Sequence, residues 1–151
     1  MSDKNDGLKV DLRKILDTVA EAEGFSPKPY LDPVGKLTIG YGWNLEGRPV
    51  DKLLGKTILL YQLTQDWQKI HVALPWAASL SEVRRLVLTE MCFNLGLTGL
   101  LGFKNTLGLV RQGKYAEAAS AMLQSRWAGQ VKGRAIRLAR SMEHNTWPGL
   151  T

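Results

Sequence analysis

The sequence has little cysteine, little histidine and no long apolar run. Its one cysteine, Cys92, excludes a disulfide within the chain. The place of Cys92 in the run LVLTEMCFNLG predicts a buried small hydrophobic side chain rather than a nucleophile. The two histidines, His71 and His144, are well separated and offer no ligand cluster. We therefore expect no metal ion and no cofactor.

Long apolar segments are also missing. No run of about 18 apolar residues is present, and the beginning of the chain mixes acids and bases where a secretory signal needs an apolar stretch. We expect no stable membrane insertion and a protein that is made and kept in a cytoplasm. The 151 residues, 44% of them hydrophobic, can bury one core, and no repeat or linker interrupts them. A single domain and a monomer are expected.

Acidic residues are scarce in the last third of the chain. Residues 101–151 hold 8 Lys+Arg but only 2 Asp+Glu, whereas residues 1–100 hold 12 of each, so the whole net charge of +6 lies at this end. Such a region is expected to face an anionic partner. Nucleic acid, an acidic envelope polymer and a membrane surface all qualify, and the alternative is a solvated basic face.

Apolar residues at helical spacing predict a mostly helical chain. Residues 8–23 form a first amphipathic helix that ends at Gly24. Ser79 and Glu82 have the spacing of a capping box, and the turns that follow are apolar nearly all round, which predicts a central buried helix. The other expected helices cover 57–72, 103–112, 114–125 and 132–142.

The periodicity changes between residues 29 and 45. There the sequence contains Asp-Pro-Val-Gly, flanked by short strand-forming pieces, with Asp, Pro and Gly at the turn positions that favour them. A β-hairpin or small sheet is expected. Thr38 and the glycines around it can serve the strands and turns alone, because glycine tolerates positive φ.

Two carboxylates flank this region in unlike settings. Glu23 continues the apolar stripe of the first helix, four residues after Val19, so we expect it to be partly desolvated. Desolvation favours the neutral acid, which a proton donor near neutral pH requires. Asp32 opens a turn, where N–H groups and water are available. Cleavage of a glycosidic bond uses such a pair of one acid and one base. The spacing alone also fits a structural alternative, in which Glu23 is an ordinary helix-end residue and Asp32 part of an ordinary Asp-Pro turn.

The segment EGFSPKPYLDPVGKLTIGYG resembles the catalytic segment of the tailed-phage lysozymes, which are endolysin-type muramidases. Their signature is Glu, eight residues, Asp or Cys, five residues, Thr, then Ile-Gly-x-Gly, and here Glu23, Asp32 and Thr38 fall at these positions. Residues 79–107 and 115–147 resemble the family's central helix and its C-terminal helices. The likeness covers most of the chain in the same order.

The resemblance implies an α+β, mostly helical fold with two lobes. Residues 1–151 would form a single lysozyme-like domain. A small β-containing lobe is expected over about 24–56 and a linking helix over about 57–72. The helical lobe would combine residues 1–23 with about 73–151.

The resemblance also implies a role for each matching residue. Glu23 would be the general acid, Asp32 would hold and deprotonate the attacking water, and Thr38 would position that water, as in an inverting reaction. Arg134 matches an arginine that pairs with the helix carrying the catalytic Glu, with a surface base as the alternative. Further matches fall where the family lines its saccharide cleft: Asn44, Phe93, Asn94 and Thr106.

The sequence departs from the family pattern at several positions. Trp43 stands where relatives often carry histidine, so a usual ion pair is expected to be missing and a stacking surface to replace it. Asn44 occupies a cleft position that is often apolar, and Ala121 one that is sometimes polar. The segment from Thr38 to Met91 is short, so we expect a trimmed β lobe.

These observations predict an enzyme that cuts the glycan strands of bacterial peptidoglycan. It would act from the host cytoplasm at lysis, or be carried by a virion. The basic last third of the chain would bind anionic envelope polymers as a further partner. A lytic transglycosylase would cut the same bond with a single Glu, and intact Asp32 and Thr38 argue against it. A nucleic-acid-binding module is favoured by the basic third with Trp127 and Trp147, but no recognition motif is present.

Overall fold

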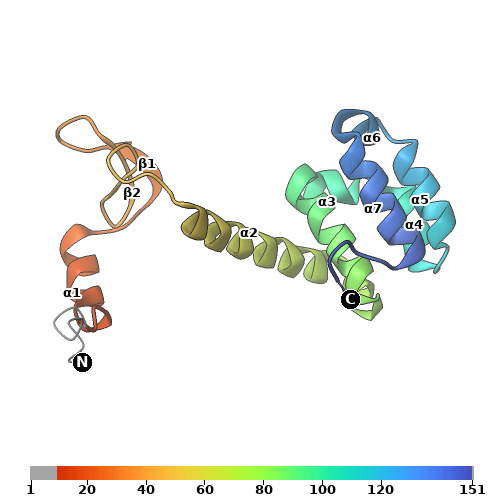
Figure 1. Ribbon diagram of the computed structural model, residues 1–151, viewed down its shortest axis with the longest axis horizontal. Helices are drawn as coiled ribbons and strands as arrows, with labels where there is room; N and C mark the ends of the chain where they lie inside the picture. Colours follow the sequence, from red (N-terminus) through yellow and green to blue (C-terminus); the bar gives the residue numbers. More distant parts are fainter. Residues whose placement is uncertain (1–9, 151) are drawn as a thin grey trace, which may run out of the picture. The chain divides into compact units, whose positions relative to one another are not determined.

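The computed structural model describes residues 10–150, which form two compact units that meet between Gly55 and Lys56. The described residues contain seven α-helices, one 3₁₀ helix and one three-stranded sheet, which confirms the predicted α+β, mostly helical class (Figure 1). The assignment of the first helix to the helical lobe, and the limits of the lobes, stay predictions.

The N-terminal unit places one helix before a small antiparallel sheet. Helix α1 covers Arg13–Glu23, and the strands are β1 (Ser26–Leu31), β2 (Leu37–Gly40) and β3 (Trp43–Asn44), in the order β1-β2-β3. The hairpin expected over 29–45 is confirmed. Gly24 ends α1 with φ 70°, as predicted. The predicted start at residue 8 lies outside the described residues, and residues 10–12 are not helical.

The C-terminal unit is helical. It contains α2 (Lys52–Ala73, which begins at the end of the N-terminal unit), η2 (Pro75–Ser79), α3 (Glu82–Leu101), α4 (Lys104–Arg111), α5 (Tyr115–Leu123), α6 (Arg126–Val131) and α7 (Gly133–His144). Helix α5 packs on α4 and α7, and α7 also packs on α3 and α6 (Figure 1). No single described helix is long and apolar enough to cross a membrane, and only α3 with α4, bent by 103°, passes that test as a pair.

One sequence expectation about these helices was wrong in detail, and one short helix was not predicted. The cap of α3 is Ser81, whose hydroxyl accepts a hydrogen bond from the N–H of Arg84 at 3.3 Å, because Ser79 is taken up by the preceding 3₁₀ helix. The short helix α6 was missed. It begins at a second serine cap, since Ser125 Oγ accepts from the N–H of Ala128 at 3.2 Å.

The core of the C-terminal unit surrounds α3, as its apolar sequence predicted. Val87, Leu88 and Met91 are at most 1% exposed. Side chains from the other helices pack against them, among them Ile70, Val110, Met122, Leu138 and Met142. Burial of such side chains contributes about 1.5–3 kcal/mol each, so this unit has its own source of stability.

Cys92 belongs to this core, as expected, and is 1% exposed. Burial raises the pKa of the thiol, the charge of Asp66 adds to that shift and Lys69 opposes it. We expect Ellman's reagent to modify the native chain at least about 100-fold more slowly than the denatured chain, because reaction requires opening of the core. Absorbance at 412 nm measures both rates, and equal rates would place the thiol outside the core.

Candidate active site

Asp32 is fixed by the turn that joins β1 to β2. Its main-chain O accepts a hydrogen bond from the N–H of Gly35 at 2.9 Å, so the Asp-Pro-Val-Gly turn forms as predicted. Its side-chain Oδ1 accepts from the N–H groups of Val34 at 3.0 Å and Lys36 at 2.7 Å. These two bonds hold the carboxylate in one orientation. Oδ2 takes part in neither bond and is available to a water molecule or substrate.

Thr38 lies on β2 close to the same turn. It pairs with Tyr30 of β1 and Asn44 of β3, and it is 4% exposed. Its Oγ1 donates a hydrogen bond to the main-chain O of Lys36 at 3.0 Å, which leaves the lone pairs of the hydroxyl as acceptors. Because side chains alternate along a strand and Lys36 pairs with Asp32, the side chains of Thr38 and Asp32 share one face of the hairpin.

Glu23 lies at the other end of β2. It is the last residue of α1, and its carboxylate lies against Gly42, in the turn between β2 and β3. A Cβ atom at position 42 would be only 2.6 Å from Oε2 of Glu23. The glycine that the Ile-Gly-x-Gly motif provides is thus the feature that admits the carboxylate. In the N-terminal unit, Asp32 and Thr38 therefore lie by the turn before β2, and Glu23 lies by the turn after it.

The N-terminal unit by itself does not desolvate Glu23. The residue is exposed, and so are the apolar residues of the same helix face, Ile15 at 53%, Leu16 at 61% and Val19 at 48%. The sequence placed Glu23 correctly on this stripe, but none of residues 10–55 covers the stripe. Partial burial of Glu23 was therefore wrong for the unit that carries it, because α1 leads into the hairpin without packing its apolar face on the sheet.

Two aromatic residues beside Glu23 were missed by the sequence analysis. Phe25 follows the glycine that ends α1, and Tyr41 is the variable residue of the Gly-x-Gly turn. Their rings lie 5.0 Å apart at 45°, and both are exposed. Their positions next to motif glycines were the only signal that could have found them.

Trp43 and Asn44 support the loop that follows β3. Trp43 Nε1 donates to the main-chain O of Arg48 at 2.8 Å, and Asn44 Oδ1 accepts from the N–H groups of Glu46 and Gly47 at 3.0 and 2.9 Å. The carbonyl of the Asn44 side chain is therefore used within its own turn. A role for Asn44 in substrate binding stays a prediction, as does a stacking role for Trp43.

Three of the predicted substrate-binding residues lie in the C-terminal unit. Asn94 Oδ1 accepts a hydrogen bond from Trp127 Nε1 at 2.8 Å, so its amide Nδ2 is left to donate. Phe93 is 38% exposed, whereas Thr106 is 4% exposed within α4. Phe93 and Asn94 are therefore accessible to a ligand within this unit, and Thr106 is mainly a core residue of it.

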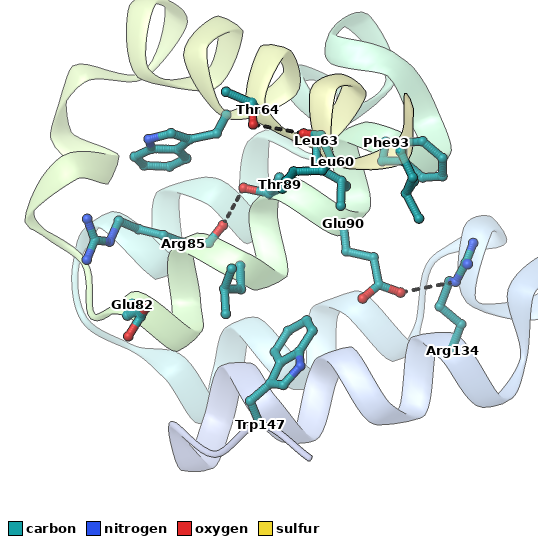
Figure 2. Close-up of a pocket in the computed structure, with 13 residues that line it drawn as sticks. Leu60, Leu63, Thr64, Glu82, Arg85, Thr89, Glu90, Phe93, Arg134 and Trp147 are labelled. Carbon is teal, nitrogen blue, oxygen red and sulfur yellow. Dashed lines mark hydrogen bonds and ion pairs between the residues drawn. The ribbon is translucent and has the colours of Figure 1, made fainter. Parts of the chain in front are cut away.

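Phe93 also lines a largely apolar cavity of about 600 Å³ in the C-terminal unit (Figure 2). Leucines and Trp67 from α2, the polar side of α3, and Trp147 form its walls. At its edge Arg134 Nε lies 3.2 Å from Glu90 Oε1, and Arg137 binds the same oxygen. Glu90 was missed by the sequence analysis, although a single acid within the apolar run of α3 is a signal of a paired charge.

The described residues hold no group of three or more His, Cys, Asp or Glu side chains arranged for a metal ion. The model of one protein family, described as phage lysozyme, matches residues 20–143. The chain belongs to the phage lysozyme family. This result confirms the resemblance inferred from the motif of Glu23, Asp32 and Thr38. The matched range contains every residue predicted for the site.

Two similar proteins of this kind come from Dictyostelium discoideum. Probable T4-type lysozyme 1 is 34% identical over 68 residues, which are 45% of this chain and 40% of that protein. Probable T4-type lysozyme 2 is 32% identical over 68 residues, with the same coverage of both chains. The match thus spans less than half the length of these curated relatives.

Proposed function

We propose that this member of the phage lysozyme family hydrolyses peptidoglycan at the β-1,4 bond between N-acetylmuramic acid and N-acetylglucosamine. The observation that supports the proposal most is the arrangement of Asp32, Thr38 and Glu23 around β2. Asp32 is held by two main-chain N–H groups with one oxygen free, and Glu23 is admitted at the other end of the strand by Gly42.

Glu23 is the proposed general acid. It gives its proton to the glycosidic oxygen as the bond from that oxygen to the anomeric carbon breaks. Helix α1 ends immediately after it, because Gly24 takes a positive φ of 70° that terminates the helix. The carboxylate is thus presented at a helix end, where a sugar chain can approach it.

Asp32 and Thr38 are the proposed partners of the attacking water. The water donates one hydrogen bond to the free Oδ2 of Asp32 and the other to the hydroxyl of Thr38, whose own hydrogen is engaged with Lys36 O. Its oxygen then bonds to the anomeric carbon as Asp32 takes a proton. Attack on the face opposite the departing oxygen inverts the anomeric centre, which is the outcome we propose.

The place of action is also proposed. The enzyme would reach the wall from the host cytoplasm during phage-induced lysis, or from outside when carried by a virion. The basic last third of the chain would help to retain it on anionic envelope polymers. The other side-chain roles proposed for the cleft are substrate contacts by Phe93, Asn94, Thr106 and Asn44, and structural support by Arg134.

Digestion of purified peptidoglycan tests the proposed reaction. We expect mass spectrometry to find fragments with reducing muramic acid ends, each heavier by one water than the corresponding anhydro form. Reducing N-acetylglucosamine ends would show cleavage of the other glycosidic bond. Anhydromuramic ends would show that the enzyme catalyses the transglycosylase reaction instead of hydrolysis. If the folded chain released no fragments, both reactions would be excluded.

A further inference from the structure

The exposed face of α7 is basic. Arg134, Arg137 and Arg140 recur at three-residue intervals along α7, where Arg134 and Arg140 are exposed and Arg137 is partly exposed. The face carries one acid, Glu143, near its end. Helix α7 thus carries three of the eight basic residues of the last third of the chain.

The carboxylate supplied by the core leaves this face positively charged. Glu90 of α3 pairs with both Arg134 and Arg137 through the same oxygen, so one negative charge faces two positive ones. Arg140 is exposed, and within residues 10–150 no carboxylate lies within ion-pair distance of it. The three arginines therefore retain about two charges that α3 does not neutralise.

A depression lies beside these arginines. It has a volume of about 430 Å³ and is lined by Arg137 and Arg140 on one side and by Thr146 and Trp147 on the other. The guanidinium carbon of Arg137 is 5.3 Å from the centre of the Trp147 ring, which restricts its orientation. Thr146 adds a hydroxyl that can donate to an anion.

The far wall of the depression is fixed to the body of the unit. Asn145 takes the left-handed conformation, with φ 55°, and turns the chain away from α7, while Asn145 Oδ1 binds the hydroxyl of Ser81. Arg84 donates to the main-chain O atoms of Met142 at 2.8 Å and Glu143 at 3.1 Å. The segment that carries Thr146 and Trp147 is thus held in place before any ligand arrives.

We propose that this depression binds a phosphate group of the bacterial envelope, as a binding site separate from the proposed hydrolytic residues. Guanidinium groups bind phosphate through paired N–H···O bonds, and Arg137, Arg140 and the Thr146 hydroxyl supply more donors than one carboxylate can use. The cavity has room for a single phosphodiester unit. Such a site would keep the enzyme on its substrate between cuts, and it needs no catalytic residue.

Calorimetric titration of the full chain tests the site. Two probes, a polyglycerol phosphate chain and vesicles containing lipopolysaccharide, distinguish polymer phosphate from lipid phosphate. Two further titrations use polyglutamate, a polymer of carboxylates, and a DNA duplex. Arg140→Gln is expected to weaken binding of one or both envelope phosphates about tenfold. Arg111→Gln, an equal charge loss at the exposed end of α4, is expected to change it by less than about twofold.

Several results would overturn the assignment. Equal losses in Arg140→Gln and Arg111→Gln would indicate a general effect of charge without a site. Polyglutamate binding as tight as phosphate binding, or no binding of either envelope phosphate, would remove the selectivity. Tighter binding of the duplex would indicate nucleic acid as the partner. Binding of a single envelope phosphate that depends on Arg140 supports the site and identifies its source.

Discussion

Glu23→Gln is expected to lower kcat for peptidoglycan hydrolysis by about 10²–10⁴-fold, the usual contribution of a general acid. Glutamine keeps the size of the side chain and removes the proton that the proposed reaction transfers. Within the described residues no hydrogen bond or ion pair ties the Glu23 carboxylate to a neighbour, and the residue is exposed. The thermal midpoint is therefore not expected to fall.

The matched control is Glu21→Gln. Glu21 is exposed on the same helix, and its replacement causes the same loss of charge. It lies two residues before Glu23, which places its side chain about 200° around the helix axis from the side chain that contacts Gly42. Its kcat is expected to stay within about twofold of the parent. Release of muropeptides from purified walls measures both variants. A Glu23→Gln enzyme with more than a tenth of the parent rate would exclude Glu23 as the general acid.

The local features of the N-terminal unit were predictable because they depend on residues close in sequence. The Asp-Pro-Val-Gly turn requires only its own four residues, and the end of α1 requires only a glycine able to take positive φ. The three proposed catalytic residues lie within sixteen consecutive positions, so a short motif contains them all. The buried character of α3 followed from its apolar composition.

Other features depend on partners that are distant in sequence. Glu90 is satisfied by two arginines more than forty residues later, and Asn94 by Trp127, so neither pairing follows from local pattern. Helix α6 is only 6 residues long and carries a glycine, which gives too little periodicity to detect. The described part of the N-terminal unit does not bury Glu23, because an apolar stripe predicts that a face can be covered without specifying what covers it.

Gly42→Ala is expected to reduce kcat by about 10²-fold with only a modest loss of stability. An alanine Cβ would stand 2.6 Å from Glu23 Oε2, closer than real Cβ atoms approach. The carboxylate is the end of a flexible, exposed side chain, so it can swing away at little energetic cost. That movement displaces the proposed acid by an ångström or more, and a misplacement of about 1 Å can cost about 10²-fold in rate.

Gly40→Ala separates this displacement from backbone strain. Both glycines have positive φ, 65° at Gly40 and 76° at Gly42, so alanine at either position costs about 1–2 kcal/mol of stability. No atom lies within 4 Å of a Cβ built at Gly40, so Glu23 keeps its place there. Chemical denaturation should therefore give similar losses for the two variants, while kcat falls strongly in Gly42→Ala alone. Equal kcat values in the two variants would mean that contact with Gly42 does not position Glu23, and the loss would then be one of backbone conformation.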